Sequence, residues 1–158
     1  MIHLVDSNLV APQPWRNGGG QTRELLAWPA GGDWQLRVSV ADIDRDGPFS
    51  AFPGVQRWFA VLSGAGVQLG LADGGRAVTP MSPPLAFDGA EAPGCRLLDG
   101  PTRDLNLMAR QTAGRAMMAA DAWGEPLRAG ARWRGVFTAV PGRLLCGDAP
   151  VAVPAFAL

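Results

Sequence analysis

Arginine side chains beside a run of glycines are the first candidates for binding chemistry in this 158-residue chain. The stretch PWRNGGGQTRELL, residues 14–26, places Arg16 and Asn17 before three consecutive glycines and Arg23 shortly after them. A guanidinium group binds carboxylates through paired hydrogen bonds, and glycine lets backbone amides approach a ligand closely. The stretch therefore indicates one of two structures. One is an anion site with amide donors from residues 17–21, and the other is a tight structural loop in which Arg23 is paired or solvated.

The glycine run lacks the features of a nucleotide-binding loop. A phosphate loop lies between a strand and a helix and ends in Gly-Lys-Ser or Gly-Lys-Thr. Here Gln21 follows the glycines, and the chain contains no lysine. The GxGxxG spacing of a dinucleotide-binding loop is also absent. These differences argue against nucleotide binding.

Two further segments place polar side chains on one face of an expected strand. In WQLRVSVA, residues 34–41, Arg37 and Ser39 alternate with apolar residues. In DGPTRDLNLM a turn precedes a strand on which Asp104 and Asn106 share a face. Two guanidinium groups with hydroxyl or amide donors nearby suit a dicarboxylate or an acyl-amino acid. Alternatively, the carboxylate and amide tie down loops through hydrogen bonds to the backbone.

Short strands bounded by glycine and proline must position these side chains. The 21 glycines and 14 prolines are spread along the chain without a period. Residues 57–71 predict a β-hairpin, and residues 84–87, 95–98, 104–110 and 134–140 add short apolar runs typical of an all-β sandwich or barrel. Residues 114–123 are rich enough in alanine for a helix, although a strand fits them equally well.

A faint repeat adds to this pattern. The segments that begin at Gln56 and Ala131 both start with an Arg-Trp pair, alternate, and break at a glycine-containing turn. Such an echo suggests two related β-halves.

Composition excludes several classes of partner. Fourteen arginines balance 14 acidic residues, so no basic field favours nucleic acid or an anionic membrane. No run of 18 apolar residues and no signal-peptide pattern is present, and we expect a cytoplasmic protein. Cys95 and Cys146 have no metal-binding spacing and are expected to be buried apolar residues in a reducing compartment.

The successive blocks PWRNGGGQTRE, RVSVADIDRDGPFSAFPGVQRWFAVLSGAGVQL, LAFDG and LLDGPTRDLNLMAR resemble the signature blocks of the HutD/Ves family, which is associated with bacterial histidine utilisation. The resemblance runs in order over residues 14–110, whereas the C-terminal third matches in character alone. It implies an all-β, compact double-barrel fold (bicupin, RmlC-like jelly roll) with little helix. Residues 1–158 would form one domain, with closely packed halves of about residues 1–80 and 81–158. Proposed ligands of the family are small acidic metabolites of histidine breakdown, such as formylglutamate.

Comparison with the first motif of metal-binding cupins predicts a site without a metal or other cofactor. If Gly64 is the closing glycine of that motif, Arg57 stands at the glutamate position, and Ser50 and Phe52 lie at or near the histidine positions. None of these is a transition-metal ligand, and His3 is the one histidine of the chain. An Arg57 directed into a barrel would need an anion, which is either an internal aspartate or a ligand.

We therefore expect a non-catalytic small-molecule-binding protein that senses or buffers an acidic metabolite. The sequence has no GxSxG motif and no Cys-His pairing. The alternative is a metal-independent cupin enzyme of isomerase or hydrolase type, with a carboxylate pair such as Asp42 and Asp104. A homodimer formed through sheet edges is a further expectation. The expected ligand-binding residues are Arg16, Asn17, Arg23, Arg37, Ser39, Ser50, Arg57, Asp104 and Asn106.

Overall fold

The computed structural model describes residues 3–120, 130–146 and 149–158. The chain divides into two compact units, one of residues 12–120 and one of residues 1–11 with residues 121–158. The expected division into halves near residue 80 remains a prediction. None of the helices in the described ranges is long and apolar enough to span a membrane.

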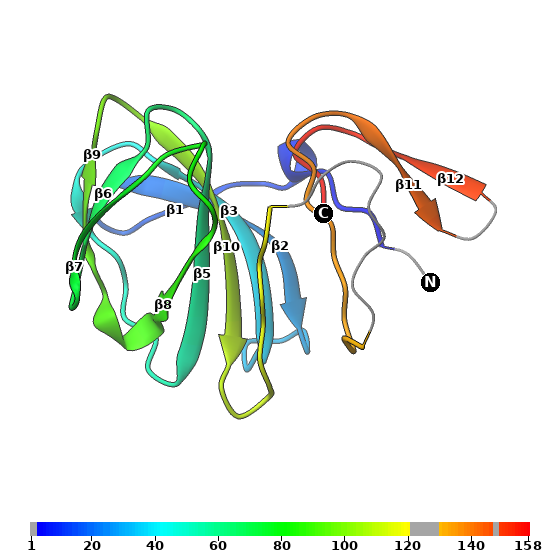
Figure 1. Ribbon diagram of the computed structural model, residues 1–158, viewed down its shortest axis with the longest axis horizontal. Coiled ribbons are helices and arrows are strands. Elements are labelled where there is room, and N and C mark those ends of the chain that lie inside the picture. The colour runs from blue at the N-terminus through cyan, green and yellow to red at the C-terminus, as the bar shows by residue number, and fades with distance from the viewer. Residues whose placement is uncertain (1–2, 121–129, 147–148) are drawn as a thin grey trace. The chain divides into compact units, whose positions relative to one another are not determined.

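The larger unit contains two antiparallel sheets, which face each other in Figure 1. The six-stranded sheet has the order β1 (Gln13–Pro14), β2 (Gly20–Trp28), β3 (Leu36–Ile43), β10 (Thr102–Arg110), β5 (Val55–Ser63) and β8 (Leu85–Asp88). The four-stranded sheet has the order β4 (Gly47–Pro48), β9 (Gly94–Leu97), β6 (Val67–Leu71) and β7 (Gly74–Val78). A short 3-10 helix, η2 (Gly89–Glu91), follows β8.

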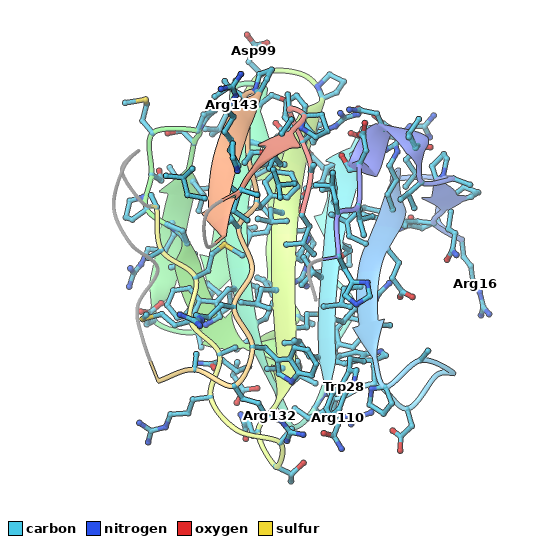
Figure 2. All side chains as sticks on the ribbon, turned by 90° about the vertical axis from the view of Figure 1, so that its right-hand side faces the viewer. Arg16, Trp28, Asp99, Arg110, Arg132 and Arg143 are labelled. Carbon is cyan, nitrogen blue, oxygen red and sulfur yellow. The ribbon has the colours of Figure 1, made fainter. Side chains whose placement is uncertain are left out.

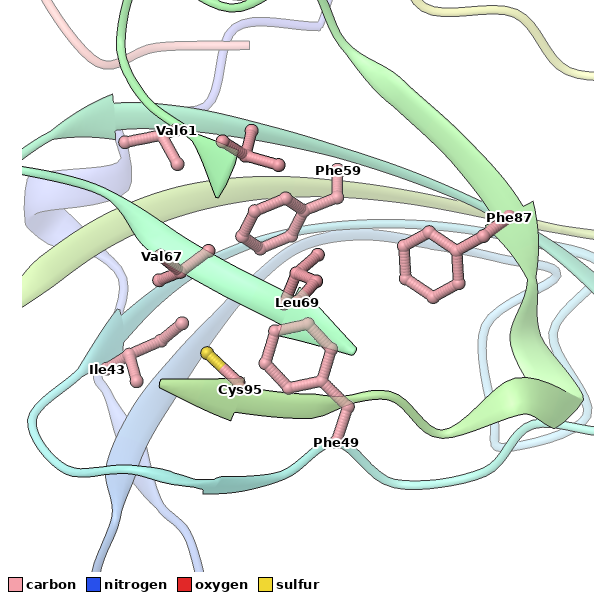
Figure 3. Packing of buried hydrophobic residues seen from close by; sticks show 9 residues of the cluster. Ile43, Phe49, Phe59, Val61, Val67, Leu69, Phe87 and Cys95 are labelled. Atoms are coloured by element: carbon pink, nitrogen blue, oxygen red, sulfur yellow. The ribbon is translucent and has the colours of Figure 1, made fainter. Parts of the chain in front are cut away.

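The hydrophobic core lies between these two sheets. Figure 3 shows Phe59 and Ile43 from the six-stranded sheet packed with Val67, Leu69 and Cys95 from the four-stranded sheet. Strand β5 explains this arrangement, because alternate residues along it are buried. One face of the six-stranded sheet, here called the inner face, therefore packs against the four-stranded sheet.

The predicted hairpin over residues 57–71 is wrong, although both of its strands exist. Strand β5 pairs with β10 and β8, whereas β6 pairs with β7 and β9. Both edges of β5 are already occupied, so the chain must continue in the facing sheet. Gly64 and Gly66 permit the change of sheet because each has a positive φ, and a Cβ there would lie 2.5 Å and 2.3 Å from backbone carbonyl oxygens.

The smaller unit contains the 3-10 helix η1 (Ser7–Leu9) and a hairpin of β11 (Gly142–Cys146) with β12 (Ala149–Val153). Thr138 bridges to Ala157, and the backbone of Val5 exchanges hydrogen bonds with Leu158. The echo segment that begins at Ala131 therefore forms a bridge and one strand, not the longer strand pattern of its counterpart.

The nearly all-β prediction is confirmed, but the expected closed barrel is not found. In the strand pairings of the described residues, the sheets of the larger unit remain separate and do not close. Residues 114–120 of the suggested helix have no helical structure, and residues 121–123 lie outside the described residues.

Candidate functional site

Four buried polar side chains form a row on the inner face of the six-stranded sheet. They are Ser39 on β3, Arg57 on β5, and Asp104 and Asn106 on β10. Asn106 lies opposite Ser39 on one neighbouring strand and opposite Phe59 of the core on the other. Residues opposite each other in antiparallel strands share a face, so the register brings these groups together inside the unit. We call these four residues the polar row.

Arg57 is held by one amide and two aromatic rings. Its Nε and Nη2 donate to Oδ1 of Asn106 at 2.9 Å and 2.7 Å. Its guanidinium carbon lies 4.4 Å from the ring centroid of Phe49 and 5.4 Å from that of Phe87. Burial lowers the pKa of Arg57 to about 10, an effect that the negative charge of Asp104 opposes. The guanidinium therefore stays charged at neutral pH.

No carboxylate of the described residues is in direct contact with this buried cation. Arg57 is 7% exposed, and among the described residues it takes part in no ion pair. A buried charge without a close partner is costly, and a guanidinium has N–H groups to spare beyond the two that Asn106 accepts. The polar row thus has unmet capacity to bind an anion.

Asp104 lies behind Asn106 in the same row. The side-chain nitrogen of Asn106 donates to Oδ1 of Asp104, while Oδ2 of Asp104 is buried without a hydrogen-bond partner among the described residues. Burial raises the pKa of Asp104 to about 7, against the lowering effects of the Arg57 charge and the Asn106 hydrogen bond. Asp104 therefore changes its charge close to neutral pH.

A second guanidinium on the inner face is already paired. Nε of Arg37 donates to Oε2 of Glu24 at 2.7 Å. Glu24 is on β2, where it lies opposite Ser39 of β3. Because its carboxylate partner is in place, Arg37 has less need of an external anion than Arg57 has.

The opposite face of the sheet carries a separate charged cluster around Asp42. Arg23 and Arg103 each donate to this carboxylate at 2.6 Å, and Gln21 donates at 3.0 Å. Burial would raise the pKa of Asp42, but the hydrogen bonds from Arg103, Gln21 and Arg23 lower it to about 2. This cluster is a structural ion pair network that joins β2, β3 and β10.

Comparison with known proteins identifies the family. The HutD family model matches residues 7–142. The chain belongs to the HutD family. An uncharacterised 21.2 kDa protein in the hutC 3' region of Pseudomonas putida is 40% identical over 111 residues, covering 68% of this chain and 57% of that protein. Protein Ves of Escherichia fergusonii is 36% identical over 98 residues, covering 61% of this chain and 51% of the relative.

Solved structures agree with the family and with the predicted HutD/Ves resemblance. The structure of HutD from Pseudomonas fluorescens SBW25 has 37% identity and a TM-score of 0.63, over 68% of this chain and 59% of that chain. The Cnp3 cupin domain of Schizosaccharomyces pombe has 10% identity and a TM-score of 0.54, over 67% of this chain and 72% of that domain. The second likeness shows a cupin-like fold. The matched part spans about half the length of the curated relatives.

In this HutD-family chain the glycine run is a tight turn between β1 and β2. The amide of Gly18 donates to the carbonyl of Trp15 at 3.0 Å, and that of Gly19 donates to Oδ1 of Asn17 at 2.9 Å. A Cβ at Gly20 would lie 2.2 Å from the carbonyl oxygen of Asp42. The turn therefore uses these two amide donors itself, and the glycine lets β2 approach β3 closely.

The predicted site residues divide into two groups. The structure brings Arg37, Ser39, Arg57, Asp104 and Asn106 together on the inner face. The others lie elsewhere: Arg16, Asn17 and Ser50 are exposed, Arg23 points to the opposite face, and Figure 2 shows the Arg16 side chain directed away from the sheet.

Sequence reasoning missed the two rings that enclose Arg57. Phe49 lies eight residues before Arg57, between β4 and β5, and Phe87 lies 30 residues after it on β8. Phe87 pairs with Arg57 across the strands, which a prediction of β-pairing would have suggested. Among the described residues, no group of three His, Cys, Asp or Glu side chains is arranged to hold a metal.

Proposed function

We propose that this chain binds a small acidic metabolite at Arg57 and does so without a catalytic step. The observation that carries the proposal is a buried guanidinium whose hydrogen-bond acceptor, within the described part of the chain, is the neutral amide of Asn106. A ligand carboxylate can pair directly with this guanidinium, which Asp104 reaches only through Asn106, and such a pair is stronger in a site from which water is excluded.

The chemistry of the polar row favours an acyl-amino acid or a dicarboxylate. Arg57 binds one carboxylate, and the hydroxyl group of Ser39 and the amide of Asn106 offer further hydrogen bonds. Phe49 and Phe87 hold the guanidinium in place, which reduces the entropy lost on binding. Formylglutamate fits this description, and relatives named HutD or encoded near hutC support a role in sensing or buffering a metabolite of histidine utilisation.

The proposal extends to the assembly and location of the protein. Membership of the HutD family supports a double-barrel arrangement within a single domain. The reduced state expected of its cysteines supports a cytoplasmic location. In the described part of the chain β7 and β8 are edge strands of their sheets, and pairing at such an edge would allow a homodimer to form.

Thermal unfolding with candidate acids tests the binding function. We expect one of N-formyl-L-glutamate, urocanate, glutamate or histidine to raise the melting temperature, with or without EDTA. At a hundred times its dissociation constant, a ligand stabilises the native state by about 2.7 kcal/mol. Arg57→Met should abolish the increase, whereas Arg16→Ala, at an exposed position, should retain it. If none of these four compounds raises the melting temperature, the proposal is wrong.

Asp104 supports a second candidate function. A carboxyl group with a pKa of about 7 beside a charged Arg57 is suited to general acid-base catalysis in a metal-independent isomerase or hydrolase. Asp42 is not its partner, because the two side chains point to opposite faces of the sheet. Proton NMR can test whether the protein converts the acid that raises its melting temperature. Conversion that is lost in Asp104→Asn would establish the enzyme. An unchanged ligand would favour binding alone.

A further inference from the structure

One continuous hydrogen-bonded chain links the Arg57 guanidinium to a carboxylate. Asn106 accepts from Arg57 through Oδ1 and donates to Asp104 through its side-chain nitrogen. At the far end of this series of hydrogen bonds, Oδ2 of Asp104 is buried without a partner among the described residues, and Asp104 is 1% exposed. Most buried polar atoms have a partner, so an orphaned carboxylate oxygen requires an explanation.

The charges of Arg57, Asp104 and a bound anion explain why Oδ2 of Asp104 is left without a partner. Within the protein itself, the positive charge of Arg57 is balanced by ionised Asp104, with the Asn106 amide between them. An incoming carboxylate would bring a second negative charge into the same buried space, where two close carboxylates do not both remain ionised readily. One proton taken up by Asp104 restores neutrality among Arg57, Asp104 and the one carboxylate that Arg57 binds.

We propose that Asp104 is the internal counter-ion of Arg57 and takes up one proton from solvent when an anion binds there, an inference that rests on the proposed function. The proton binds to Oδ2, forms a new O–H bond and converts the carboxylate to a neutral acid. Asn106 keeps its orientation, because Oδ1 of Asp104 accepts from its amide in either state.

The charged and titratable groups that interact with Asp104, directly or through a neighbour, come from several elements. They are Arg57 on β5, the Arg37–Glu24 ion pair on β3 and β2, Cys95 on β9, Asp46 before β4, and Asp42 on the opposite face of β3. Burial, with the nearby charges of Asp104 and Asp46, raises the pKa of the Cys95 thiol to about 12. Arg57 remains charged, with a pKa of about 10, and Asp42 ionises with a pKa of about 2. Of these shifted groups, Asp104 titrates near neutrality, with a pKa of about 7.

Titration calorimetry of the whole chain with N-formyl-L-glutamate tests the coupling. Both carboxyl groups of this probe stay ionised above about pH 6, because ordinary carboxyl pKa values lie near 4. Heats measured at one pH in buffers of different ionisation enthalpy give the number of protons taken up. We expect this number to approach one above about pH 7, and the dissociation constant to rise about tenfold per pH unit there.

Asp104→Asn should bind the same probe without proton uptake and with an affinity that does not depend on pH. Asp99→Asn, at an exposed position, should behave like the unmodified chain. Binding without proton uptake in the unmodified chain would overturn the inference and leave the proposed function intact. Failure of every acid to bind would overturn both. If Asp104→Asn does not fold, the proton count of the unmodified chain still decides.

Discussion

The guanidinium of Arg57 donates two hydrogen bonds to the side-chain oxygen of Asn106, at 2.9 Å and 2.7 Å, deep on the inner face of the six-stranded sheet. A buried cation is thus satisfied by a neutral acceptor, while the nearest carboxylate in the hydrogen-bonded chain, Asp104, is reached through that same amide. This arrangement makes Asn106 important for stability as well as for the proposed binding.

Asn106→Ala should therefore destabilise the fold strongly. The substitution removes the acceptor of Arg57 and the donor to Asp104, leaving two buried charges without partners. We expect the free energy of unfolding to fall by about 3 kcal/mol in urea denaturation. Asn8→Ala, at an exposed position, should change it by no more than about 0.5 kcal/mol. A similar small loss in Asn106→Ala would show that the amide does not hold the two charges.

Asp104 should make the protein less stable as the pH rises. Its folded pKa of about 7 lies above the ordinary value of 3.8, so the folded state binds more protons between these two values. Stability must then decrease from about pH 4 to about pH 7, by an amount on the order of 3 kcal/mol. Urea denaturation at about pH 5 and pH 8 measures this decrease. Asp104→Asn should lack it, and an equal decrease in both proteins would assign it to other groups.

Arg23→Ala tests whether the Asp42 cluster and the polar row have different roles. Arg23 pairs with Asp42 on the face opposite the polar row. The variant should lose about 1 kcal/mol of stability but keep the full increase in melting temperature produced by a bound acid. Loss of that increase, with stability unchanged, would instead place Arg23 in the binding site.

Gly20→Ala tests the structural role of the glycine run. Its Cβ would lie 2.2 Å from the carbonyl oxygen of Asp42, so β2 and β3 would have to separate. We expect a loss of about 3 kcal/mol or more in thermal or urea unfolding. Gly47→Ala provides the matched control, because a Cβ at Gly47 would have nothing within 4 Å and the φ of this glycine is not in the left-handed region. Equal stabilities for the two variants would refute close packing at Gly20.

Strand alternation was sufficient to predict part of the site. The period of two placed Arg37 with Ser39 and Asp104 with Asn106 on common faces, and the structure has both pairs on the inner face. Alternation alone does not reveal which face becomes the inner one, nor which strands become neighbours. The positions of Arg23 and Asp42 show the consequence, since the register of β2 on β3 directs both away from Arg57.

The change of sheet after β5 and the rings around Arg57 depend on tertiary contacts, which the sequence pattern does not reveal. A turn such as residues 63–66 serves a hairpin or a change of sheet equally well, and the outcome depends on whether β5 already has two neighbours. Likewise, Phe49 from the loop before β5 and Phe87 from the neighbouring strand β8 contact Arg57 through the tertiary fold. No local pattern specifies such contacts.

Binding of N-formyl-L-glutamate by Arg57 is the central claim, and titration calorimetry of the unmodified chain beside Arg57→Met tests it most directly. We predict saturable binding at one site at neutral pH. This binding should be abolished in Arg57→Met, while circular dichroism shows that both proteins remain folded. Binding that persists in Arg57→Met, or its absence from the folded unmodified chain, would contradict the account.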